Sequence, residues 1–177
     1  GYIFFDKFKP LKFELFQWFP NPEINFEFYL DGLSGVMMVL ICVLSLVIQL
    51  FSTSYMSKDE NYTKYFEYFN FFVFSMLLLV LSGNFLVMFF GWELVGLSSY
   101  LLISFWSEKK SAARAGNKAF ILNRIGDFGF LIGLMMILNE FQTFNFLRIF
   151  ESSLETKPEN LDVIIVFLLL GAFGKSA

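Results

Sequence analysis

Four ionisable side chains stand inside long apolar stretches of this sequence: Glu93, Arg124, Asp127 and Lys175. A charge at the centre of a bilayer costs about 2.5–3.5 kcal/mol on insertion scales, so such residues usually face a partner or a water-filled cavity. A buried lysine changes its pKa readily, and a nearby carboxylate controls how far it changes. A Glu93–Lys175 pair shared between two helices could therefore hold and release a proton as the two groups move closer or apart.

A purely structural role is the alternative for each of these charges. Arg124 and Asp127 lie three residues apart, the spacing of an ion pair within one helix, so the structural and functional interpretations are equally good for them. Glu93 has no opposite charge three or four residues away and needs a partner on another helix. Lys175 is flanked by two glycines and a serine, which favours a broken helix near Lys175, buried in protein or lining water.

The apolar stretches are long enough to place these residues in transmembrane helices, which need about 20 mostly apolar residues each. Residues 82–84 (Ser-Gly-Asn) are a turn signal that divides one overlong stretch into two. Gly129 and Gly133 are spaced for close helix packing. We predict an all-α, polytopic transmembrane helix bundle with spans at about 32–56, 68–81, 85–106, 119–138 and 161–177 onward. Residues 1–31 are predicted to form an extramembrane loop or short strand segment, because residues 24–30 alternate between apolar and polar.

These spans predict which connecting segments share a side of the membrane. Residues 1–31, 82–84 and 139–160 fall on one side, and residues 57–65 and 107–118 fall on the other. The second group carries more Lys and Arg in shorter loops, so the positive-inside rule places it in the cytoplasm or matrix.

Composition excludes several other classes of protein. Hydrophobic residues make up 56% and charged residues 16%, with a mean hydropathy of +0.62, too apolar for a water-soluble domain. A net charge of −3 argues against nucleic acid as a partner. One cysteine (Cys42) and no histidine leave no disulfide framework, metal site or iron–sulfur ligand set. The start at Gly1 and the end inside an apolar run lead us to expect part of a larger polypeptide, and 27 phenylalanines suggest an organelle genome.

Three ordered motifs resemble one family of membrane proteins. They are FFGWELVGLSSYLLISFW at 89–106, NRIGDFGF at 123–130 and GKSA at 174–177. In residue type and spacing they are similar to the antiporter-like membrane subunits of respiratory NADH dehydrogenase (complex I), and in particular to the mitochondrial chain 5 group. The resemblance runs from about Phe26 to the end of the sequence, so the chain corresponds to a fragment of such a subunit.

The resemblance implies a site and a set of partners. Glu93 would be the conducting glutamate that pairs with Lys175, and Lys175 would be the proton carrier of a half-channel. Arg124 and Asp127 would be a charged pair of the helix before the one that carries Lys175. The chain would be a non-redox subunit of a proton-pumping NADH:ubiquinone reductase in the mitochondrial inner membrane, inactive alone. It would hold no cofactor, whereas the complex uses NADH, FMN, iron–sulfur clusters and ubiquinone. Its partners would be other membrane-arm subunits, the remaining parts of the same subunit and membrane lipids.

Two alternatives remain open at this point. Subunits of multi-subunit sodium/proton antiporters share the glutamate and the lysine, so this pair does not separate them from complex I. A structural membrane-arm subunit would use the same charges only to pack helices.

Overall fold

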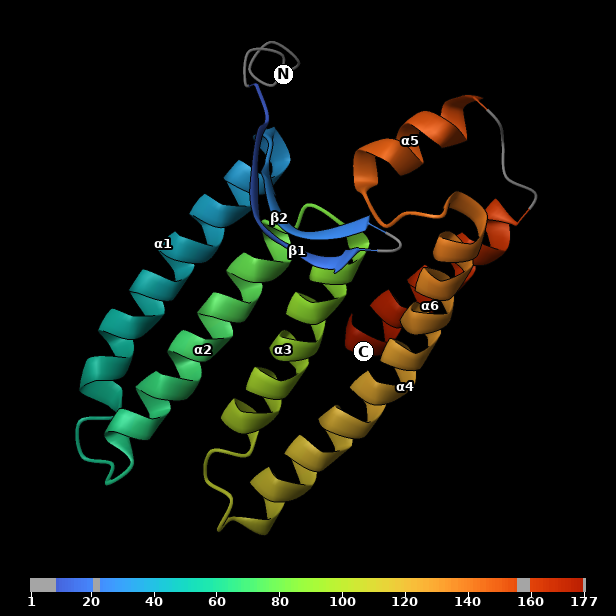
Figure 1. Ribbon diagram of the computed structural model, residues 1–177. Helices are drawn as coiled ribbons and strands as arrows, with labels where there is room; N and C mark the ends of the chain where they lie inside the picture. The colour runs from blue at the N-terminus through green and yellow to red at the C-terminus, as the bar shows by residue number, and fades with distance from the viewer. Residues whose placement is uncertain (1–8, 21–22, 156–159, 177) are drawn as a thin grey trace.

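The computed structural model describes residues 9–20, 23–155 and 160–176, which form a helical bundle with a hairpin across one end (Figure 1). The first eight residues and Ala177, which belong to predicted segments, lie outside the described residues. The elements are β1 (Leu11–Pro20), β2 (Glu23–Leu30), α1 (Gly32–Tyr55), α2 (Tyr62–Val80), α3 (Phe85–Ile103), α4 (Lys110–Phe141), α5 (Phe146–Glu155) and α6 (Leu161–Ser176). Helices α1, α3 and α4 are long and apolar enough to cross a membrane.

The predicted spans agree with the helices at some boundaries and differ at others. Helix α1 begins as predicted at Gly32, because Asp31 and Ser34 form a reciprocal capping box with N–O distances of 2.8 and 2.7 Å. Helix α3 begins after the predicted turn, where Asn84 accepts a hydrogen bond from the Val87 amide at 2.9 Å. These short polar side chains occupy the N-cap position that satisfies free amides of the first turn.

The other boundaries need correction. Helix α2 begins at residue 62 rather than 68, α3 ends at 103 rather than 106, and α4 runs over 110–141 rather than 119–138. The added segments contain Lys, Arg, Ala and Glu, which favour helix whether or not they lie in a membrane. Hydropathy marks the apolar part of a helix and not its ends. Helix α5 was not expected in the polar segment 139–160. The predicted break near Lys175 is absent from the described residues, where α6 runs through Lys175 to Ser176.

The hairpin lies against the ends of α2 and α3. Strands β1 and β2 pair antiparallel, with register shifts between Glu14 and Phe16 and between Gln17 and Phe19. The Tyr29 amide donates to the Leu81 carbonyl at 2.8 Å. Figure 1 shows the hairpin, the α2–α3 turn and α5 at one end of the bundle, and the α1–α2 and α3–α4 connections at the other. This arrangement matches the predicted division of the connecting segments between two sides.

Glycines allow α4 and α6 to approach closely. A Cβ at Gly126 of α4 would lie 2.8 Å from the Cα of Gly174 on α6, closer than two carbon atoms can pack. A Cβ at Gly133 would lie 3.0 Å from a methyl carbon of Leu168. The predicted close packing along this glycine spacing is therefore present, and it joins α4 to the helix that carries Lys175.

We expect Gly126→Ala to destabilise the bundle by about 1–3 kcal/mol, since the added methyl meets main-chain atoms that cannot move aside. Gly35→Ala in α1 is the matched control, because its Cβ would have only the Leu30 side chain within 4 Å, at 3.9 Å. The readout is the melting temperature and yield of the assembled protein in mild detergent. Equal values for the two variants would contradict this account of the α4–α6 contact.

Candidate functional site

Helices α3, α4 and α6 bring the four predicted charged residues into one cluster. Arg124 of α4 forms an ion pair and hydrogen bond with Glu93 of α3. Lys175 Nζ of α6 lies 4.0 Å from Asp127 Oδ1 of α4. Arg124 also lies 3.9 Å from Asp127 Oδ2, the contact expected from their spacing. The cluster holds two cations and two carboxylates, so its formal charge is zero.

The partners within this cluster differ from the predicted ones. Within the described part of the chain, no ion pair joins Glu93 directly to Lys175; Arg124 is the cation on Glu93, and Asp127 is the carboxylate nearest Lys175. Glu93 and Lys175 are thus linked through Arg124 and Asp127. Sequence reasoning identified the members of the cluster, but it paired Glu93 directly with Lys175, because a sequence does not show how the helices are rotated about their axes.

Burial differs between the two halves of the cluster. The Asp127 and Lys175 side chains are 7% and 15% exposed, whereas those of Glu93 and Arg124 are 21% and 43% exposed. Gly96, less than one turn after Glu93, leaves room for the lysine: a Cβ there would lie 3.1 Å from Lys175 Nζ. The Asp127–Lys175 half is therefore the inner part of the site, and the Glu93–Arg124 half is the outer part.

Trp92 contacts both members of the inner half. Its indole N–H donates to Asp127 Oδ1 at 2.7 Å, and its carbonyl accepts a hydrogen bond from Lys175. The ammonium also lies 4.7 Å from the ring centroid, within range of a cation–π interaction. The ring stacks on Phe130 at 5.2 Å. Sequence reasoning gave Trp92 no role in the site, and its place beside Glu93 in the motif was the available signal.

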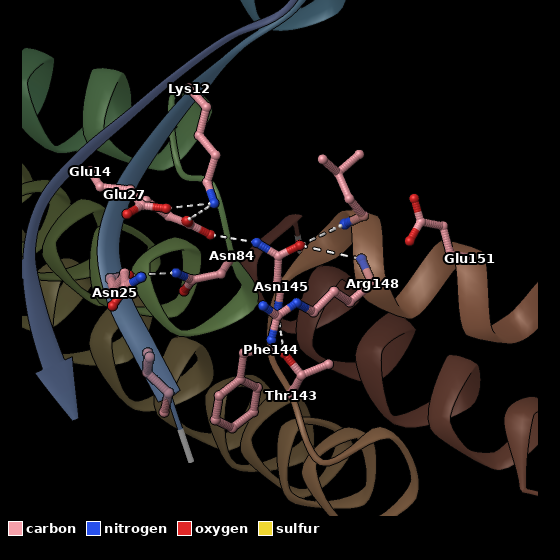
Figure 2. Close-up of a pocket in the computed structure, with 12 residues that line it drawn as sticks. Lys12, Glu14, Asn25, Glu27, Asn84, Thr143, Phe144, Asn145, Arg148 and Glu151 are labelled. Atoms are coloured by element: carbon pink, nitrogen blue, oxygen red, sulfur yellow. Dashed lines mark hydrogen bonds and ion pairs between the residues drawn. The ribbon is translucent and has the colours of Figure 1, made fainter. Parts of the chain in front are cut away.

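A second polar site lies outside the bundle, between the hairpin and the start of α5 (Figure 2). It is a cavity of about 320 Å³ around Glu27, whose side chain is only 3% exposed. Glu27 accepts from Lys12 Nζ at 2.8 Å and from Asn145 Nδ2 at 2.7 Å. The Asn84 side chain donates to the Asn25 carbonyl at 2.8 Å, as Figure 2 also shows. The alternating pattern of β2 gave no sign that Glu27 would be buried.

Two exposed charges of the hairpin shift each other's pKa. The pKa of Lys12 lies above its ordinary value of 10.5, first because of its hydrogen bond to Glu14 and then because of Glu27. The pKa of Glu14 lies below its ordinary value of 4.5, chiefly because of the hydrogen bond from Lys12. The Lys12–Glu14 ion pair therefore persists over the whole neutral pH range. Among the described residues, no group of three or more His, Cys, Asp and Glu side chains is arranged to hold a metal ion.

Comparison with protein families decides to which family the chain belongs. Residues 82–177, more than half of the chain, match the family described as NADH:quinone oxidoreductase/Mrp antiporter, TM. The chain belongs to this family. Residues 18–66 match the family described as the N-terminus of NADH-ubiquinone oxidoreductase (complex I) chain 5. The resemblance indicated by the three sequence motifs is thereby confirmed.

Curated members of the family give the same result. The chain is 43% identical over 166 residues to NADH-ubiquinone oxidoreductase chain 5 of Acanthamoeba castellanii, covering 88% of the chain and 25% of that relative. It is 41% identical over 163 residues to NADH-quinone oxidoreductase subunit L of Campylobacter jejuni, covering 92% and 27%. The chain thus spans about a quarter of the length of these relatives. Related sequences occur in both eukaryotes and bacteria.

Solved structures show the same fold within larger membrane assemblies. The Mrp complex from a Dietzia species superposes with a TM-score of 0.87 at 23% identity, covering 99% of this chain and 19% of that one. A membrane-bound sulfane sulfur reductase, an archaeal respiratory membrane complex, gives a TM-score of 0.70 at 22% identity, covering 99% and 27%. The antiporter-like helix bundle is therefore the fold of this family member, a membrane-embedded multi-pass chain. The relatives and structural neighbours are parts of multi-subunit membrane complexes.

We expect Glu27→Gln to loosen the hairpin of this family member, because the amide presents donors to Lys12 in place of a buried charge. The loss of one buried partner costs about 1–3 kcal/mol. Glu14→Gln is the matched control, since Glu14 is an exposed partner of the same lysine and surface ion pairs contribute little to stability. Limited subtilisin proteolysis of the hairpin reads out both variants. Equal cleavage of the two would show that the buried carboxylate does not fasten the hairpin.

The same proteolysis should depend on pH in a defined direction. A raised pKa means that the Lys12 contribution is complete below pH 10.5 and is lost as pH rises through the higher folded value. A lowered pKa means that the Glu14 contribution is present above pH 4.5 and is lost as pH falls through the lower folded value. We expect protection of the hairpin to be constant between these limits and to fall above pH 10.5. A Lys12→Met variant should not lose protection of the hairpin above pH 10.5. If this variant still loses protection there, another group causes the effect.

Proposed function

We propose that the chain is part of a proton-translocating membrane subunit of respiratory NADH:ubiquinone oxidoreductase (complex I) in the mitochondrial inner membrane. The observation that carries the proposal is the cluster of Glu93, Arg124, Asp127 and Lys175, held by three helices of an antiporter-like bundle. Family membership and the identity to chain 5 sequences support the choice of complex.

The geometry supports a specific role for each charge. Lys175 is the proton carrier, because a lysine in such a poorly hydrated place can exist in charged and neutral forms. Asp127 is its nearest counter-ion, at 4.0 Å. Arg124 faces both carboxylates, so a movement of its guanidinium from Glu93 to Asp127 would withdraw the charge that favours a protonated lysine. Glu93 therefore acts on Lys175 through Arg124 and Asp127.

We further propose that the chain is a non-redox subunit and inactive alone. The described residues include one free cysteine, the exposed Cys42, and the sequence has no histidine, so the donor set does not fit an iron–sulfur cluster. In this proposal NADH, FMN, the iron–sulfur clusters and ubiquinone are bound by other subunits. The partners are the other membrane-arm subunits, the remaining parts of the same subunit and membrane lipids.

A sodium/proton antiporter subunit is the second candidate, favoured by the likeness to the Mrp complex, whose fold superposes with a TM-score of 0.87. It predicts sodium-dependent proton transport in vesicles without added NADH. The proposed complex I subunit predicts NADH-driven pumping that does not need sodium. Transport assays with and without sodium, and with and without NADH, separate the two candidates.

We expect Lys175→Met, in the complete complex, to lower the number of protons pumped per NADH or the coupled turnover, because a thioether cannot carry a proton. Lys110→Met is the matched control, since Lys110 lies at the exposed start of α4 and, within the described part of the chain, takes no part in the ion pairs of the cluster. Proton uptake into sealed vesicles is measured together with NADH oxidation. Normal pumping by Lys175→Met would refute its role as the carrier.

Glu93→Gln should act in the same direction as Lys175→Met, because it releases Arg124 to pair with Asp127 alone. The variant is compared with Glu108→Gln, an exposed glutamate in the α3–α4 connection. The amount of assembled complex is measured on native gels beside the pumping assay. Poor assembly with normal pumping in what assembles would instead support a structural role for this carboxylate.

A further inference from the structure

Among the described residues of the site, Trp92 alone contacts the inner charges, Asp127 and Lys175, with both its side chain and its main chain. The indole N–H donates to Asp127 Oδ1 at 2.7 Å. That same oxygen is the one that faces Lys175, at 4.0 Å. The other oxygen, Oδ2, faces Arg124 at 3.9 Å. The orientation of the Asp127 carboxylate therefore divides its two oxygens between two cations.

We propose that Trp92 is a positioning residue that fixes this orientation and so keeps Asp127 available to Lys175. The inference rests on the proposed function and adds a member to its site. Without the indole donor, the carboxylate is free to rotate and present both oxygens to Arg124, whose planar guanidinium suits a bidentate contact. Lys175 would then lose its nearest counter-ion although neither charged residue had changed.

The ring supplies a second contact that depends on the charge of the lysine. The ammonium lies 4.7 Å from the ring centroid, and this attraction exists only for the protonated form. The Trp92 carbonyl also accepts from Lys175, but any residue at this position would provide that carbonyl. Side-chain variants therefore test the indole donor and the ring without removing the main-chain contact.

Packing is the competing explanation, since the ring stacks on Phe130 at 5.2 Å with an interplanar angle of 20°. Phenylalanine keeps a stacking ring and a face for the ammonium but has no N–H. If Trp92 only packs, Phe should largely replace it. If Trp92 orients Asp127, Phe should fail in the same way as a change to Asp127 itself.

The test is Trp92→Phe in the complete complex, with Trp106→Phe as the matched control. Trp106 makes the same kind of bond, from its indole N–H to Asp59 Oδ2 at 2.9 Å, but at the exposed end of the bundle. We expect Trp92→Phe to lower NADH-driven proton pumping about tenfold, the lower end of what one hydrogen bond to a charged group contributes. Trp106→Phe should pump normally. Normal pumping by Trp92→Phe would overturn the inference.

A double-mutant cycle separates positioning from packing. If Trp92 acts through Asp127, adding Trp92→Phe to Asp127→Asn should cause no further loss, because the oriented carboxylate is already gone. If the two losses multiply, Trp92 acts by packing and the inference is wrong. Should the Phe variant assemble poorly, 3-benzothienylalanine at position 92 replaces the N–H by sulfur at nearly constant shape and gives the same test.

Lys175→Met, measured in the same series, separates this inference from the proposed function. Normal pumping by Lys175→Met would remove the proposed function and the inference with it. Impaired pumping by Lys175→Met with normal pumping by Trp92→Phe would leave the proposed function in place and remove only the role of Trp92.

Discussion

The cost of placing charge in an apolar bundle is the constraint on which the rest of this structure depends. Two cations and two carboxylates lie among helices whose other residues are mostly apolar, and each ion must find a partner there. The glycines that let α4 and α6 touch directly precede two of these ions: Gly126 precedes Asp127, and Gly174 precedes Lys175. Close backbone approach at one position therefore brings the lysine of α6 within reach of the aspartate of α4 at the next.

The same principle operates at the end of the bundle that carries the hairpin. Glu27 is buried there, and Lys12 and Asn145 satisfy its oxygens from two segments far apart in sequence. Gly83 permits this burial, because a Cβ at that position would lie 2.7 Å from the Glu27 side chain. The buried carboxylate and its partners thus join the two strands of the hairpin to the segment before α5, where apolar packing alone would specify no fixed register.

Sequence reasoning predicted the membership of the charged cluster, the Ser82–Asn84 turn, the start of α1 and the close packing at Gly129 and Gly133. These features depend on residue type and local spacing, which a sequence displays directly. It did not predict that Arg124 would pair with Glu93, because helix rotation decides between partners at similar depth. It also missed α5 and the burial of Glu27, since both depend on contacts between segments distant in the chain.

A neutral cluster of four charges has a property that a single ion pair lacks. Loss of a proton from Lys175 would leave one cation facing two carboxylates, and Arg124 already lies beside both of them. The guanidinium cannot be deprotonated in a protein, so it can answer that change only by moving. Any event that moves Arg124 would in turn alter the proton affinity of Lys175, because linkage is reciprocal. The outer half, Glu93 and Arg124, is thus placed to transmit charge changes to the inner half, Asp127 and Lys175. The indole of Trp92 keeps the Asp127 carboxylate of that inner half oriented toward the lysine.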